Sequence, residues 1–299
     1  MVNKDSKKNA LMDEVIKLMI TSQKGLFIKF KKPILKIFSA YEYYWIYYIC
    51  HSVIERTPLI SWLNKIGILK DESLVPRVFY VGLGKTGSSS ISIGIKENCT
   101  HWHNRDHIKI LYKTSILEDN DISLYDFIMY IGEKYNFKPL IVESYRELVS
   151  RCISTTLENL DTQNTDIKDY KTFIDNIKID EKDIGPYSLK WKEYFGVDIV
   201  KDFNKEKGFY YKELDNVKLL FLKFDKIKEW NNIFKEIGYV YKPIWANNSN
   251  KKHQYDLYRE VLQKYKVPLD KLNKIYNYPV VQAIYTPEEI KKFKNRWSE

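Results

Sequence analysis

The sequence predicts an α/β domain, in which helices flank a parallel β-sheet, preceded by a helical N-terminal extension. Three apolar runs, each followed by a segment of helical periodicity, carry this prediction. The runs are residues 75–84, 138–145 and 218–227, and the helices that follow them are 88–98, 147–160 and 228–237. Strands that alternate with helices favour a parallel sheet, because each helix returns the chain to the start of the next strand.

The other elements follow from the same patterns. Residues 11–70 predict two or three helices that break near Pro33 and Pro58, since proline cannot donate a helical hydrogen bond. Residues 99–105 fit either a short second strand or a loop. Further helices are expected at 121–136, 254–275 and 286–297. We therefore divide the chain into a helical extension, residues 1–74, and an α/β domain, residues 75–299.

The chain is long enough for one large domain, and it is basic. It has 299 residues, of which 44% are hydrophobic, and a formal net charge of +10. Such a charge suits nucleotides, nucleic acid, acidic glycans or a membrane surface, although a general residue bias toward Lys, Asn, Ile and Tyr would also produce it. The three cysteines are far apart in sequence, which argues against a disulfide framework and favours a reducing, cytoplasmic compartment.

One aromatic stretch near the N-terminus is strongly apolar. Residues 37–54 contain Glu42 and His51 and fall short of a clean 18-residue apolar span. Residues 10–20 carry three charges and do not form the apolar region of a signal peptide. We expect the stretch to pack on the main domain or on another subunit, with peripheral membrane contact through residues 27–54 as the alternative.

Residues 80–92, YVGLGKTGSSSIS, have the composition of a phosphate-binding loop. In a Walker A loop four residues separate the leading glycine from the Gly-Lys pair, here Gly84 and Lys85, and that alignment places Phe79, a strand residue, at the glycine position. Glycines 82, 84 and 87 do satisfy the dinucleotide fingerprint. Two features count against it: three serines follow the last glycine, and residues 101–106 are too polar for a buried parallel strand.

A third interpretation is a loop of the form G-K-T-G-S-S-S at the end of a P-loop-type sheet. Backbone N–H groups and a helix N-terminus would surround a phosphate, Lys85 would add a charge, and the hydroxyls would add donors. The residues concerned are Gly84, Lys85, Thr86, Gly87, Ser88, Ser89 and Ser90. This loop resembles the one with which sulfotransferases hold the 5′-phosphosulfate of 3′-phosphoadenosine 5′-phosphosulfate (PAPS).

A second pair of residues strengthens the resemblance. Sulfotransferases hold the 3′-phosphate with an Arg after a later strand and a Ser eight residues further on. Here the predicted strand ends before Arg146, and Ser154 follows at that offset. Eight helical positions are a little over two turns, so Ser154 returns near the helix face that Arg146 overlooks. A guanidinium fork and a hydroxyl are both suited to phosphate oxygens.

Several stretches between residues 75 and 297 resemble a bacterial branch of this superfamily that is assigned to capsular polysaccharide synthesis. They are GKTGSSSI (84–91), THWHN (100–104), YRELVSRCIST (145–155), YFGVDI (194–199), NNSNKKHQYDLY (247–258) and YTPEEIKKFKNRW (285–297). The chain departs from the branch at Leu148, where proline is common, and at His253 and Gln254, where Trp-Tyr is favoured. The resemblance implies a sulfotransferase fold, PAPS as the donor, adenosine 3′,5′-bisphosphate (PAP) as the product and a glycan acceptor; it implies no nucleic-acid partner.

Sulfuryl transfer requires a cation at the leaving phosphate and a base for the acceptor hydroxyl. Lys85 is the candidate cation. For the base we favour the histidine pair His101 and His103, since both would face the same side of an extended segment. His103 is weighted slightly above His101, and Glu143 is a further candidate. The resemblance places Lys252 on the 3′-phosphate. No metal is expected, because no Cys other than Cys99 and no His-Glu-x-x-His pattern accompanies the histidines. The alternatives are a kinase-like P-loop enzyme and a non-catalytic nucleotide- or glycan-binding protein.

Overall fold

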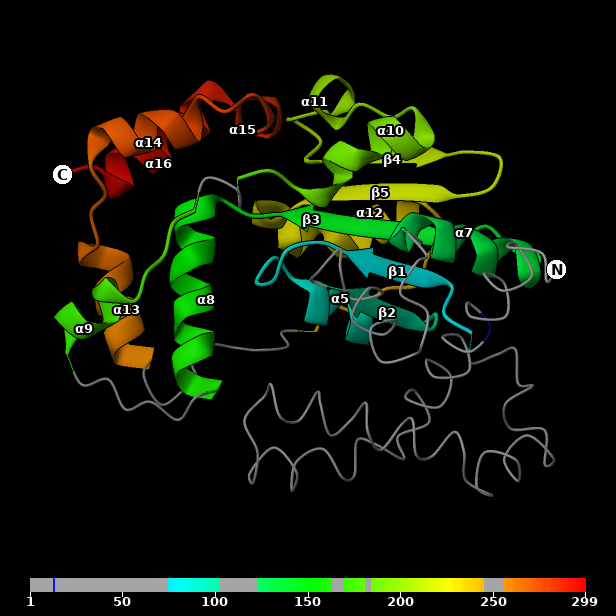
Figure 1. The fold of residues 1–299 in the computed structure, drawn as a ribbon, viewed down its shortest axis with the longest axis horizontal. Helices are drawn as coiled ribbons and strands as arrows, with labels where there is room; N and C mark the ends of the chain where they lie inside the picture. The colour runs from blue at the N-terminus through cyan, green and yellow to red at the C-terminus, as the bar shows by residue number, and fades with distance from the viewer. Residues whose placement is uncertain (1–12, 14–74, 103–122, 163–168, 181–183, 245–254) are drawn as a thin grey trace, which may run out of the picture. The chain divides into compact units, whose positions relative to one another are not determined.

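The computed structural model describes residues 13, 75–102, 123–162, 169–180, 184–244 and 255–299 (Figure 1). The chain divides into two compact units, residues 1–77 with 105–139 and residues 78–104 with 140–299. In the first unit the structure describes helix α7, Leu124–Lys134, which begins at a capping box formed by Ser123 and Asp126. The helices predicted at 11–70 and the segment 27–54 lie outside the described residues.

The second unit contains a five-stranded sheet in the order β2-β1-β3-β5-β4. The strands are β1 (Val78–Val81), β2 (Cys99–Trp102), β3 (Leu140–Tyr145), β4 (Phe209–Glu213) and β5 (Lys218–Lys223). Strands β2, β1, β3 and β5 are parallel, with β1 paired to β2 and to β3 through Val78↔Cys99 and Val78↔Leu140. This confirms the α/β class, but β4, which was not predicted, pairs with β5 in the antiparallel sense.

Helices follow β1, β3 and β5 as expected, and four short helices between residues 170 and 202 were not predicted. The helices are α5 (Ser88–Gly94), α8 (Leu148–Thr162), α9 (Tyr170–Asp175), η4 (Tyr187–Lys190), α10 (Trp191–Phe195), α11 (Ile199–Asp202), η5 (Phe224–Glu229), α12 (Trp230–Glu236), α13 (Tyr255–Lys264), α14 (Leu269–Tyr276), α15 (Pro279–Ile284) and α16 (Pro287–Trp297). The single helix predicted at 254–275 is wrong. It is interrupted before Pro268, because proline disfavours the helical conformation of the residue that precedes it.

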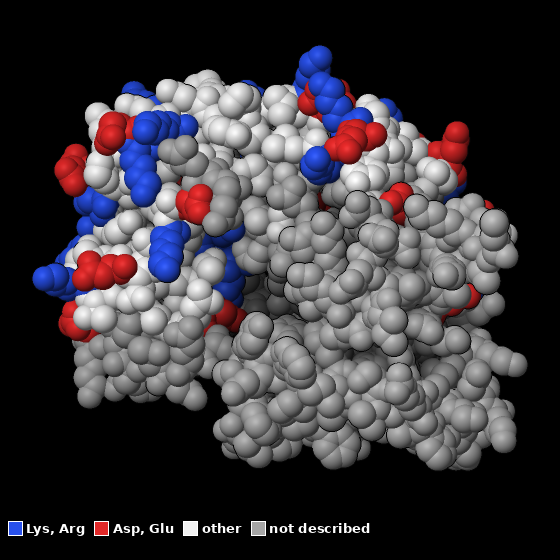
Figure 2. Space-filling view, viewed as in Figure 1, with Lys and Arg blue, Asp and Glu red and all other residues white. Residues whose placement is uncertain are grey.

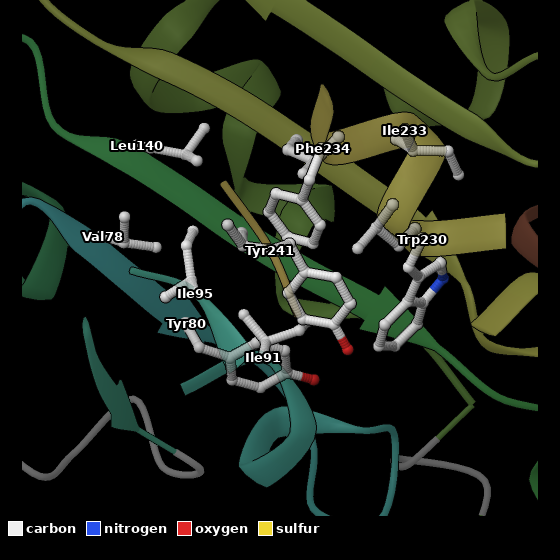
Figure 3. Close-up of a cluster of buried hydrophobic side chains, with 12 residues drawn as sticks. Val78, Tyr80, Ile91, Ile95, Leu140, Trp230, Ile233, Phe234 and Tyr241 are labelled. Atoms are coloured by element: carbon white, nitrogen blue, oxygen red, sulfur yellow. The ribbon is translucent and has the colours of Figure 1, made fainter. Parts of the chain in front are cut away.

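Strands β1 and β3 are buried on both faces, which explains their continuous apolar runs. Figure 3 shows one face, where side chains of β1, β3 and β5 pack against α5 and α12. This cluster comprises Val78, Tyr80, Ile91, Ile95, Leu140, Val142, Leu220, Leu222, Trp230, Ile233, Phe234 and Tyr241. On the other face Phe221 meets the edges of Trp191 and Phe203, with ring centroids 6.4 Å and 5.5 Å apart. Side chains therefore pack on both faces of the sheet, and this packing holds the strands in place.

Strand β2 decides between the two alternatives for residues 99–105, a strand or a loop. Residues 99–102 form a strand that pairs in parallel with β1. The strand lies at the edge of the sheet, where Cys99 and Thr100 are only partly buried, so polar residues are compatible with it. In the described part of the chain, no helix is both long and apolar enough to span a membrane.

Candidate phosphate-binding site

The two predicted phosphate ligands lie at neighbouring strand ends. Residues 82–87 follow the carboxyl end of β1, and Arg146 directly follows β3. Strand β1 lies between β2 and β3, so the connection from β1 to β2 runs to one side and the connection from β2 to β3 returns to the other. The gap between the ends of β1 and β3 is therefore the switch point of the parallel sheet. Ligands of open α/β sheets bind at such switch points, outside the carboxyl ends of the strands.

The loop after β1 has a constrained backbone. Lys85 has a φ of 65° and Gly87 a φ of 97°, both in the left-handed region. A Cβ on Gly87 would lie 2.6 Å from the Trp230 ring, whereas one on Gly84 would meet nothing within 4 Å. The loop therefore packs tightly at its last glycine and is open at Gly84.

Thr86 braces the loop from inside. Its side chain is fully buried, and its hydroxyl donates to the Leu83 carbonyl (2.6 Å) and contacts the Tyr80 hydroxyl. The Tyr80 hydroxyl also contacts Ser144 Oγ at 2.9 Å, and the Ser144 hydroxyl donates to the Thr86 carbonyl. Burial raises the pKa of Tyr80 well above its ordinary value, so its hydroxyl keeps its proton. Thr86 was predicted to contact the cofactor, but its hydroxyl forms hydrogen bonds within the loop and with β1 instead.

Arg146 lies against this loop. Its Nη1 donates to the Lys85 carbonyl at 3.2 Å, and its guanidinium lies 4.7 Å from the centroid of the Phe224 ring. Phe224 in turn meets the edge of Trp230, the residue that packs on Gly87. The guanidinium is half-buried and held from two sides, which limits the entropy that it would lose on binding a ligand.

Helix α8 faces the loop with a polar stripe. Lys85 Nζ lies 2.6 Å from Glu158 Oε2, and their side chains are 17% and 37% exposed. Ser154, half-buried, precedes Glu158 by four residues and so lies one turn away on the same face. Glu147 directly precedes the helix, and its carboxylate accepts from the backbone N–H groups of Val149 and Ser150, both at 2.8 Å.

Glu143, a candidate base, is buried and hydrogen-bonded to the backbone. Its side chain is buried, and its two oxygens accept hydrogen bonds from the backbone N–H groups of Tyr187, at 2.7 Å, and Ser188. A Cβ on Gly82 would lie 3.0 Å from Glu143 Cγ, so the loop passes directly over this side chain. The carboxylate ties β3 to η4, and this favours a structural role for Glu143.

The other predicted residues are described only in part. Ser88 and Ser90 are buried at the start of α5, and Ser89 is half-buried. Because α5 has seven residues, the side-chain charges would contribute more to anion binding than its dipole. His101 lies in β2, paired with Tyr80, but its side chain lies outside the description. His103 and Lys252 also lie outside the described residues.

A buried ionic cluster at the end of β5 was not predicted. Lys223 is 1% exposed, and its Nζ lies 2.6 Å from both carboxylate oxygens of Glu289 on α16. Beside it the Tyr285 hydroxyl donates to Asp225 at 3.1 Å, and burial raises the pKa of Asp225. The only sequence signal was a lysine at the end of an apolar run, KLLFLK, where a charge has to find a partner.

The surface charge is mixed. Figure 2 shows Lys and Arg side chains interspersed with Asp and Glu side chains over the described part of this face. The described part of this face therefore shows no broad basic patch, and the candidate site is defined by local residues such as Lys85 and Arg146. Among the described residues, no group of three or more His, Cys, Asp or Glu side chains could hold a metal ion.

Comparison of the chain with family models, with curated proteins and with solved structures finds no match.

Proposed function

We propose that this chain is a sulfotransferase that binds PAPS at the carboxyl ends of β1 and β3 and transfers its sulfuryl group to a glycan hydroxyl. The contact between Arg146 Nη1 and the Lys85 carbonyl carries the proposal. It brings together two basic residues whose phosphate roles were inferred separately from the sequence. A nucleotide that carries a phosphate at each end of its ribose needs such a pair of cationic positions.

In the proposed reaction the acceptor oxygen attacks the sulfur atom in line with the bridging oxygen. The bond between sulfur and the bridging oxygen breaks, PAP leaves, and the proton of the acceptor hydroxyl passes to a base. Lys85 would neutralise the charge that develops on the leaving phosphate. Arg146, Ser154 and Lys252 would hold the 3′-phosphate, and the backbone N–H groups of 84–90 the 5′-phosphate.

His103 or His101 is proposed as the base, because both oxygens of Glu143 already accept backbone hydrogen bonds. Neutral imidazole is available for this role near pH 7. The glycan acceptor, and a place in polysaccharide synthesis, are proposed from the sequence resemblance. No metal takes part in the proposed chemistry.

Calorimetric titration with PAP and with ATP tests the nucleotide. We expect PAP to bind more tightly than ATP, and Arg146→Ala to weaken PAP at least roughly tenfold, because a charge-assisted contact to phosphate contributes about 1.5–3 kcal/mol. Arg259→Ala is the matched control, since that exposed arginine also lies over an aromatic ring, Tyr255. A preference for ATP, or indifference to Arg146→Ala, would contradict the proposal.

Transfer of labelled sulfate from PAPS to a panel of glycans then separates an enzyme from a nucleotide- or glycan-binding protein. We expect His103→Ala or His101→Ala to lower turnover by roughly 10²–10⁴-fold, as general-base catalysis contributes. Full turnover in both variants would exclude the histidines as the base. Binding of PAP without transfer to any glycan would favour the non-catalytic alternative.

A dinucleotide is the second candidate ligand. The G-x-G-x-x-G loop and α5 connect β1 to β2, and because β2 pairs in parallel with β1 they form the βαβ unit in which the dinucleotide fingerprint occurs. Titration with NAD and NADP distinguishes it from PAP. Binding of either dinucleotide at the expense of PAP would reverse the order of the two candidates.

A further inference from the structure

The ammonium group of Lys85 already has an anionic partner in this structure. Its Nζ lies 2.6 Å from Glu158 Oε2, and with only 17% of its side chain exposed Lys85 is well shielded from solvent. Glu158 is 37% exposed and belongs to α8, the helix that also carries Ser154. The contact therefore joins the charged residue of the β1 loop to the helix on the other side of the candidate site.

A carboxylate at this position has an electrostatic reason. Arg146 donates to the Lys85 carbonyl, so its guanidinium lies against the loop that also bears the Lys85 ammonium. Like charges repel one another, and the repulsion is stronger where water is partly excluded. Glu158 offsets it in the protein without ligand. The same carboxylate, however, would lie next to any phosphate that binds Lys85.

We propose that Glu158 is a counter-ion that a ligand phosphate displaces from Lys85, and that it determines which anions the loop accepts. An incoming anion must attract Lys85 more strongly than a carboxylate does. A phosphate dianion meets this requirement, whereas chloride or a carboxylate does not. The inference rests on the proposed function for the identity of the nucleotide, but it applies to any phosphate that binds at the loop.

The displacement predicts opposite effects of one substitution on stability and on binding. Glu158→Gln removes the charge and keeps the size of the side chain. It should lower the stability of the ligand-free protein slightly, since partly exposed ion pairs contribute up to about twofold to fivefold in the folding equilibrium. It should tighten the binding of inorganic pyrophosphate and of PAP by roughly fivefold, because the repelling carboxylate is gone. A residue with only a structural role would weaken both.

The experiment combines calorimetry with the reactivity of the lysine. Pyrophosphate and PAP are titrated into the full chain and into Glu158→Gln, Lys85→Gln and the double variant. Glu193→Gln is the matched control, because it removes the same charge from an exposed pair, Lys190–Glu193, on another helix. In parallel, the labelling rate of Lys85 by an amine-reactive reagent is measured by peptide mass spectrometry, with expected acceleration in Glu158→Gln only.

The outcomes are distinct. Tighter anion binding in Glu158→Gln, no change in Glu193→Gln and no gain from Glu158→Gln in the Lys85→Gln background would support the displacement. Unchanged or weaker binding in Glu158→Gln, or an equal gain in the Lys85→Gln background, would overturn it. If pyrophosphate follows the expected pattern but PAP does not bind, the proposed function fails and the role of Glu158 stands. If PAP binds and Glu158→Gln has no effect, the reverse holds.

Discussion

At the scale of single residues, Lys85 combines a side chain that is proposed to bind phosphate with an unfavourable backbone conformation. Its φ of 65° lies in the left-handed region, which costs an L-residue roughly 1–2 kcal/mol. Such strain persists where the surroundings hold the residue, and it is concentrated at binding sites. The Arg146 hydrogen bond to the Lys85 carbonyl and the ion pair with Glu158 supply that hold.

This conformation predicts an unusual order of stability for two variants. Both Lys85→Ala and Lys85→Gly lose the ion pair and should lose phosphate binding. Lys85→Gly should nevertheless be the more stable of the two, by about 1 kcal/mol, because glycine adopts this conformation without strain. Urea unfolding of both variants checks the order. Equal stabilities would mean that Lys85 does not keep this φ in solution.

At the scale of elements, Trp230 fixes the loop that joins β1 to α5, because its ring packs against Gly87 at the end of that loop. Gly87 precedes α5 with a φ of 97°, and the Trp230 ring leaves no room for a Cβ. Trp230 is itself fully buried, and its indole Nε1 donates to the Lys223 carbonyl at 3.2 Å. The ring is therefore not free to move aside.

We expect Gly87→Ala to lower the free energy of unfolding by about 2–4 kcal/mol, since it adds backbone strain to a steric clash. Gly84→Ala is the matched control within the same loop, and it should change the free energy by less than about 0.5 kcal/mol. Urea unfolding measures both. A large effect of Gly84→Ala would show that the loop is more tightly packed at that glycine than this structure has it.

At the scale of the whole second unit, the Lys223–Glu289 ion pair joins the end of β5 to the C-terminal helix α16. Glu289 also serves the capping box of α16, where its Oε2 accepts from the Thr286 N–H at 2.8 Å. Removing one partner of a buried ion pair is costly, because the other charge is left in a poorly solvated place.

Glu289→Gln should therefore lower the free energy of unfolding by about 2 kcal/mol, although glutamine can still close the capping box. Glu288→Gln, an exposed neighbour in the same helical turn, is the control and should cost less than about 0.5 kcal/mol. Thermal or urea unfolding distinguishes them. Equal costs for the two variants would indicate that Lys223 finds another partner.

The sequence by itself determined the order of strand, loop and helix around Lys85, the strands before Arg146 and η5, and the helix that carries Ser154. These features follow from periodicity and turn chemistry within about 15 neighbouring residues, so they can be read locally. The sequence did not reveal β4, whose three aromatic residues and two charged residues lie at the edge of the sheet, or the break before Pro268.

The tertiary structure alone decided the strand order, the contact of Arg146 with the Lys85 carbonyl 61 residues away, and the burial of Glu143 beneath backbone donors 44 and 45 residues away. It also paired Lys85 with Glu158 and Lys223 with Glu289. The physical reason is that a charge or a hydrogen-bond donor has many partners of the right kind along a chain. Which partner it meets depends on how the sheet brings distant segments together.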